Sequence, residues 1–149
     1  MNSLFNADLE AGLRRSMKGS AFIAPLELSF AQKCLQEFQN FVRKTPDAFR
    51  SIMVFEYFPF NKIIEVDQTD TAFANRGAHG NMLWIMGWTK EEHDEECRQW
   101  TRHMSWEAHQ EFERRKSTLE EDGVSEYSVG QYFNYDGRSS IIMPLSIMG

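Results

Sequence analysis

The apolar positions change from strand-like to helical spacing early in the chain. A short apolar segment, Ser20 to Leu26, is followed by apolar side chains three and four residues apart. These are Phe30, Cys34, Phe38, Phe41 and Val42. The pattern predicts a strand and then an amphipathic helix, which stops before the breaker combination Thr45-Pro46-Asp47.

Two further segments have the composition of strands. Ser51 to Phe60 is rich in β-branched and aromatic residues and is closed by Pro59 and Asn61. Asn81 to Trp88 is similarly apolar and bounded by polar residues. Both predict buried or half-buried strands.

A second helix is predicted after the third strand. Thr89 is a suitable N-cap, and the acidic residues after it favour a helix N-terminus. The helix is expected to run towards Lys116 with an apolar inner stripe of Cys97, Trp100, Met104 and Phe112. After a turn, Val124 to Tyr135 predicts a fourth strand, and Ile141 to Met148 an edge strand or a docking tail.

The predicted order is strand, helix, strand, strand, helix, strand, which is the ferredoxin-like split βαβ arrangement of the α+β class. We expect one domain over residues 1–149, with a polar leader at 1–19 and a tail at 138–149. An antiparallel sheet with helices on one face leaves the other face bare. We expect a partner's sheet to cover it in a homodimeric α+β barrel, with the C-terminal tail as the alternative.

The composition is that of a globular domain, with 42% hydrophobic and 26% charged residues. The net charge of −6 makes nucleic acid an unfavourable partner. The apolar segments are too short for a membrane span, and no signal-peptide pattern is found, so a cytoplasmic location is expected. Cys34 and Cys97 lie inside helical patterns and are expected to be reduced core thiols.

Four landmarks follow one another from the middle of the chain onwards. Ala72-Phe73, two further residues and Arg76 precede a strand that ends in Trp88. A long acidic helix with an internal Trp100 follows, and then a Tyr-x-Asn-Tyr element that here is Tyr132 to Tyr135. In this order the landmarks resemble the substrate-binding region of the berberine bridge enzyme-like FAD-linked oxidases.

The resemblance covers the substrate-binding region alone. The family's FAD domain, with its phosphate-binding segment and flavin tethers, has no counterpart in this sequence, and no glycine-rich dinucleotide loop is found. Ser139 to Pro144 stands where the family has a Lys-x-x-Tyr-Asp-Pro segment. We therefore expect a free-standing substrate-binding domain that uses no cofactor.

Three residues are candidates for acid/base chemistry. The resemblance implies a catalytic base at Tyr135, which is otherwise a rim aromatic. Glu56 is a carboxylate in an otherwise apolar strand, an environment typical of catalytic acids, although it could also face solvent or pair with Arg76. His79 shares strand parity with Asn81 and suits proton transfer, with a surface loop histidine as the alternative.

The candidate substrate-binding residues lie around this group. Phe58 shares a face with Glu56, and Arg76 could hold an anionic oxygen or pair with Asp67 or Asp70. Trp84 could line an apolar cavity or belong to the core beneath the helices. The full set is Phe58, Arg76, Asn81, Trp84, Gln131 and Phe133.

Metal binding is not expected. His93 and Cys97 are one helical turn apart, but no third ligand follows at motif spacing.

Together these features favour a cofactor-independent enzyme of small-molecule biosynthesis. Its reaction would be an acid/base-assisted cyclisation, isomerisation or rearrangement of a hydrophobic substrate. The alternative is a non-catalytic small-molecule-binding or partner subunit, and a third hypothesis is a fragment of a longer gene.

Overall fold

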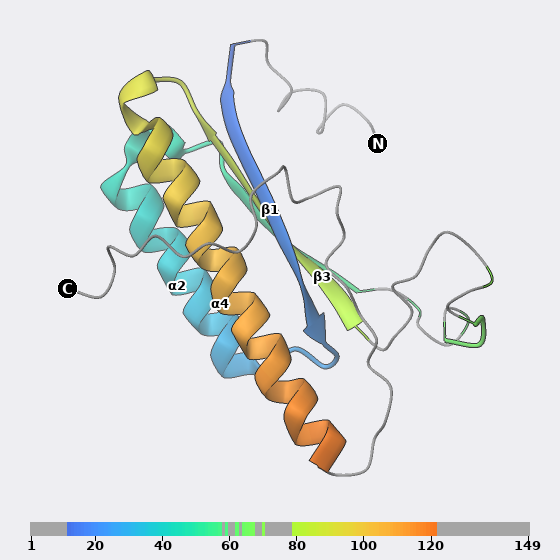
Figure 1. Ribbon diagram of the computed structural model, residues 1–149. Helices are drawn as coiled ribbons and strands as arrows, with labels where there is room; N and C mark the ends of the chain where they lie inside the picture. Colours follow the sequence, from blue (N-terminus) through green and yellow to red (C-terminus); the bar gives the residue numbers. More distant parts are fainter. Residues whose placement is uncertain are drawn as a thin grey trace.

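The computed structural model describes residues 12–57, 59, 62, 64–67, 70 and 79–121. They form an α+β arrangement of one sheet and two long helices, shown in Figure 1. In chain order the elements are β1 (Arg14–Ile23), α2 (Leu28–Lys44), η1 (Pro46–Ala48), β2 (Ile52–Glu56), β3 (His79–Trp88), η2 (Glu91–His93) and α4 (Asp94–Glu121). No described helix is long and apolar enough to cross a membrane.

The described sheet has three strands in the order β1-β3-β2, and β3 is antiparallel to both neighbours. Met82 lies opposite Ser20 of β1 and Phe55 of β2. Helices α2 and α4 lie side by side against one face (Figure 1), which we call the helix face. The α+β class, the antiparallel sheet and the two helices were predicted correctly.

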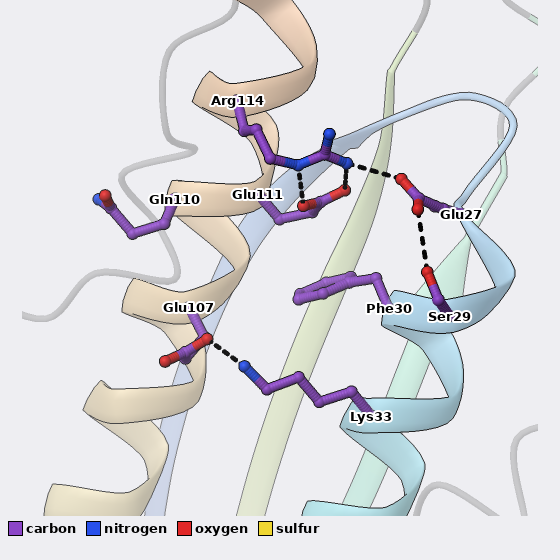
Figure 2. A pocket seen from close by; sticks show the side chains of 8 residues that line it. All are labelled: Glu27, Ser29, Phe30, Lys33, Glu107, Gln110, Glu111 and Arg114. Carbon is purple, nitrogen blue, oxygen red and sulfur yellow. Dashed lines mark hydrogen bonds and ion pairs between the residues drawn. The ribbon is translucent and has the colours of Figure 1, made fainter.

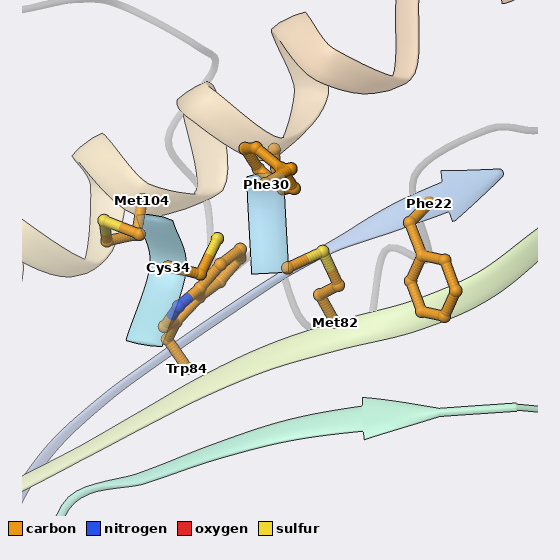
Figure 3. Packing of buried hydrophobic residues seen from close by; sticks show 7 residues of the cluster. Phe22, Phe30, Cys34, Met82, Trp84 and Met104 are labelled. Carbon is orange, nitrogen blue, oxygen red and sulfur yellow. The ribbon is translucent and has the colours of Figure 1, made fainter. Parts of the chain in front are cut away.

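The core between the helices and the sheet contains alternate residues of β3. Met82, Trp84, Met86 and Trp88 are fully buried. Figure 3 shows Trp84 and Met82 pointing towards Phe30 and Cys34 of α2 and Met104 of α4. Because side chains alternate across a strand, the odd-numbered residues of β3 point to the opposite face. We call it the open face because neither helix covers it, although its residues His79 and Leu83 are buried.

The two predicted helical stripes are confirmed as the inward faces of the helices. Phe30, Cys34 and Phe41 are the buried residues of α2. On α4, Cys97, Met104 and Phe112 are buried, and the half-buried Trp100 stacks on Phe41 with ring centroids 4.8 Å apart. The helix spacing read from the sequence therefore identified the packed faces.

Helix α4 runs along β1 in the same direction. At its beginning, Asp94 accepts hydrogen bonds from the Arg14 guanidinium at the start of β1. Near its other end, Arg115 Nη1 donates to the backbone oxygens of Ile23 (3.3 Å) and Pro25 (2.6 Å), just past the end of β1. The chain thus leaves the described region at the Ile23 end of the sheet.

The strand boundaries differ from the predictions in three places. β1 begins at Arg14, inside the predicted polar leader, because it pairs along the full length of β3. β2 ends at Glu56, and Pro59 cannot donate a ladder hydrogen bond beyond it. β3 begins two residues early, at His79, which pairs with Ile23. The predicted strand Val124 to Tyr135 lies outside the described residues.

Candidate functional site

The Glu56 carboxylate lies on the open face of the sheet. Glu56 is the last residue of β2 and lies opposite Asn81 of β3. Both side chains are half-buried, and Asn81 Nδ2 donates a long hydrogen bond of 3.4 Å to Glu56 Oε2. The geometry therefore pairs a carboxylate with an amide beside the apolar part of the sheet.

His79 belongs to the same face at the next position along β3. It is two residues before Asn81, so both side chains point to the same side of the strand. His79 is 6% exposed and lies opposite Ile23 of β1. His79 and Glu56 are diagonal neighbours on adjacent strands, a relation in which Cα atoms are about 7–8 Å apart.

The rest of the open face is mainly aliphatic. Leu83 lies opposite Val54 on one side and Gly19 on the other, while Ile85 lies opposite Ile52 and Met17. Leu83 is buried and Met17 is 40% exposed. Polar side chains thus occupy the Ile23 end of this face, and apolar side chains its middle.

Trp84 does not join this group, which corrects its prediction as a substrate-binding residue of the same site. Its side chain is on the helix face, fully buried among core residues. The indole Nε1 has no hydrogen-bond partner in the structure. The even parity that separates Trp84 from Asn81 is the physical reason.

Five predicted site residues lie outside the described part of the chain. They are Phe58, Arg76, Gln131, Phe133 and Tyr135. The structure therefore brings together Glu56, Asn81 and His79 of the predicted set. The alternation of side chains along each strand was the sequence signal that grouped these three residues.

The two thiols are core groups, as predicted. Cys34 and Cys97 are fully buried and not disulfide-bonded. Burial raises the pKa of Cys34 to about 12 and that of Cys97 to about 11. Neither thiol is therefore ionised near neutral pH, and nucleophilic chemistry is not favoured there.

Metal ligation is not supported within the described residues, where no group of three or more His, Cys, Asp or Glu side chains could hold an ion. The two ring nitrogens of His93 lie near carboxylates: Nε2 is 3.6 Å from Glu92 Oε1, and Nδ1 is 3.8 Å from Glu96 Oε2.

A surface groove of about 420 Å³ lies between α2 and α4 and was not predicted (Figure 2). Ion pairs cross it: Lys33 Nζ to Glu107 (2.5 Å) and Arg114 Nη2 to Glu27 (2.6 Å). Phe30, 8% exposed, lines its wall. Each charged side chain of the groove contacts one of opposite sign, and three carboxylates share two cations. Periodicity within one helix could not have shown pairing between two helices.

Comparisons with protein-family models, with curated proteins and with solved structures give no match for this chain. The relationship to the berberine bridge enzyme-like oxidases stays a prediction from the sequence landmarks.

Proposed function

We propose that the open face of the sheet binds a hydrophobic small molecule and that Glu56 transfers a proton to it. The observation that carries this proposal is the Glu56–Asn81 pair beside His79 and a strip of aliphatic side chains. Apolar surface supplies the binding free energy, and the few polar groups orient the ligand. The resemblance to a substrate-binding region agrees with this choice of face.

The proposed chemistry is acid/base catalysis on a carbonyl compound. Glu56 donates a proton to the carbonyl oxygen, while His79 removes a proton from the adjacent carbon. His79 then delivers the proton it holds to a different carbon of the conjugated enol, and the enol hydroxyl returns its proton to Glu56, so the product is an isomer of the substrate and both residues are restored. A cyclisation or rearrangement of a hydrophobic natural product would use the same two groups, and no cofactor is needed for these steps.

We propose that Asn81 holds the Glu56 carboxyl in place. Its amide donates to Oε2, which leaves Oε1 for the substrate. A positioned acid is more effective than a mobile one because less conformational freedom is lost in the transition state.

We also propose the complete split βαβ order, with Val124 to Tyr135 as a fourth strand beside β1. β1 is an edge strand of the described sheet, and α4 delivers the chain to its Ile23 end. A strand that returns antiparallel to β1 would finish near Arg14. Tyr135 would then lie at the other end of the face from Glu56 of the same chain, which makes His79 our preferred proton acceptor.

The test uses NMR to measure the binding of a panel of apolar ketones and alcohols to the full chain. We expect amide shift changes at Val54, Glu56, Asn81 and Leu83. Glu56→Gln should bind the same compound with a Kd within about threefold of the wild-type value, but it should no longer isomerise any compound that the wild type converts. The exposed Glu113→Gln on α4 should change neither the binding nor the conversion. Shift changes confined to the helices would contradict the proposal. Binding without turnover would favour the non-catalytic binding subunit.

A further inference from the structure

A second apolar stripe runs along α2, beside the stripe that is buried against the sheet. Its members follow one another at intervals of three and four residues: Leu28, Ala31, Leu35, Phe38 and Val42. Leu28 is 71% exposed and Leu35 is 47% exposed, and the other three side chains are half-buried. This spacing is that of a helix surface that packs along another helix.

The second stripe points away from α4. Lys33, whose Nζ forms the ion pair with Glu107, marks the side of α2 that faces α4. Successive residues of a helix are about 100° apart, so Leu35 points about 160° away from Lys33. The stripe is therefore not covered by the neighbouring helix.

The surface around the stripe is uncharged, although 26% of the residues of the chain are charged. Within the range Leu28 to Val42 the charged residues are Lys33 and Glu37, which lie one turn apart on the α4 side. The polar residues that border the stripe are the neutral Gln32 and Gln39. Because charged residues are depleted at the centre of protein interfaces, this composition is that of an interface and not of a solvated helix surface.

The stripe is complementary to a second copy of itself in the antiparallel direction. Leu28 and Val42 each lie seven residues from Leu35, so a two-fold axis at Leu35 brings Leu28 level with the partner's Val42. Ala31 then comes within one residue of the level of the partner's Phe38, which places a small side chain beside a large one. The antiparallel order also sets the opposite ends of the two helix dipoles side by side.

We propose that α2 forms the two-fold interface of a homodimer, with Leu35 at the axis. The stripe is thus covered by α2 of a second copy, and apolar contact holds the two helices together. One helix pair buries less than the roughly 1,200–2,000 Å² of a standard interface, so the dimer is expected to dissociate in the micromolar range. This arrangement leaves the open face to the ligand, whereas the barrel expected from the sequence would cover that face.

The first test measures the mass of the full chain by light scattering and sedimentation, from about 1 µM to about 500 µM. Wild type should pass from 17.4 kDa to twice that mass as the concentration rises. Leu35→Glu should weaken the dimer at least about tenfold, because pairing would bury an uncompensated carboxylate at the axis. Gln36→Glu adds the same charge at the next residue, which is exposed and outside the stripe, and should leave the dimer unchanged. Circular dichroism establishes that both variants are folded, and Leu28→Glu serves if Leu35→Glu does not fold.

The second test places a cysteine at the axis. Under mild oxidation Leu35→Cys should form a disulfide with its own counterpart in the partner, whereas Gln36→Cys should not. The native thiols Cys34 and Cys97 are buried and do not compete. A wild type that stays monomeric over the whole range would overturn the proposal and assign the stripe to another occupant. Equal dimer affinity in wild type and Leu35→Glu, or equal cross-linking of the two cysteine variants, would also overturn this interface.

Discussion

At the scale of single residues, Asp94 joins the ends of three elements. Its carboxylate accepts hydrogen bonds from Arg14 of β1, including one of 2.8 Å from Nη2, and from Trp88 Nε1 of β3 at 2.8 Å. Arg98 Nη2 lies 3.2 Å away on the next turn of α4. The hydrogen bond from Arg14 holds the pKa of Asp94 well below its usual value.

We predict that Asp94→Asn lowers the urea midpoint of unfolding at pH 7. The amide oxygen can still accept from Trp88, but the charge facing Arg14 is lost. Because the pKa of Asp94 is lower in the folded state, its stabilisation is fully present above pH about 4 and declines as the pH falls further. The difference between wild type and variant should therefore shrink from pH 5 to pH 2. A difference that stays constant over this range would contradict the account.

Gly80 is required by close packing. A Cβ there would lie 2.1 Å from Phe22 Cζ and 2.6 Å from the backbone oxygen of Glu56. We predict that Gly80→Ala destabilises the fold by about 1–3 kcal/mol, because the ring and β2 must both move. A Cβ added at Gly87 would lie 2.7 Å from Leu13 Cδ2, and the end of this flexible side chain can move more easily. Chemical denaturation should show the larger loss for Gly80→Ala, and equal losses would contradict this reading.

Strand parity accounts for what could be predicted at the residue scale. Glu56, His79 and Asn81 share a face because each occupies the matching position in its strand. The sequence of β3 alone could not show whether its odd-numbered or its even-numbered residues face the helices, since β3 is apolar at nearly every position. Both a cavity-lining and a core position therefore stayed open for Trp84, and the positions of the helices show that it belongs to the core.

At the scale of elements, aromatic packing rather than surface charge holds α2 to α4. Phe41 is buried and stacked on Trp100, whereas the groove is crossed by ion pairs of partly exposed side chains. Exposed ion pairs contribute little because water screens them.

We predict that Phe41→Ala costs roughly 3–5 kcal/mol of unfolding free energy. Lys33→Ala, which removes the 2.5 Å pair with Glu107, should cost less than about 1 kcal/mol. Denaturation of both variants in one buffer gives the comparison. A larger loss for Lys33→Ala would mean that charge, and not packing, joins the helices.

Helices were easier to predict than strand ends, for a physical reason. The apolar spacing of α2 and the breaker at Pro46 define that helix locally. The start of β1 depends on a partner far along the chain, because Arg14 is held in the strand by pairing with Trp88. No local signal in Arg14 to Gly19 reports that pairing.

At the scale of the whole molecule, two layers account for the division between stability and proposed function. The helix face carries the buried aromatic, methionine and cysteine side chains, while the open face carries the carboxylate, the amide and the histidine. Because the core packs on the helix face, the polar side chains of the open face are not needed for that packing.

A crystal structure of the full chain with the tightest-binding ketone or alcohol tests the central claim most directly. Our account predicts ligand density on the open face, with a ligand oxygen within hydrogen-bond distance of Glu56 or Asn81 and the apolar body over Leu83. Ligand density in the groove between α2 and α4, together with an open face covered by other parts of the same chain, would contradict the proposed site.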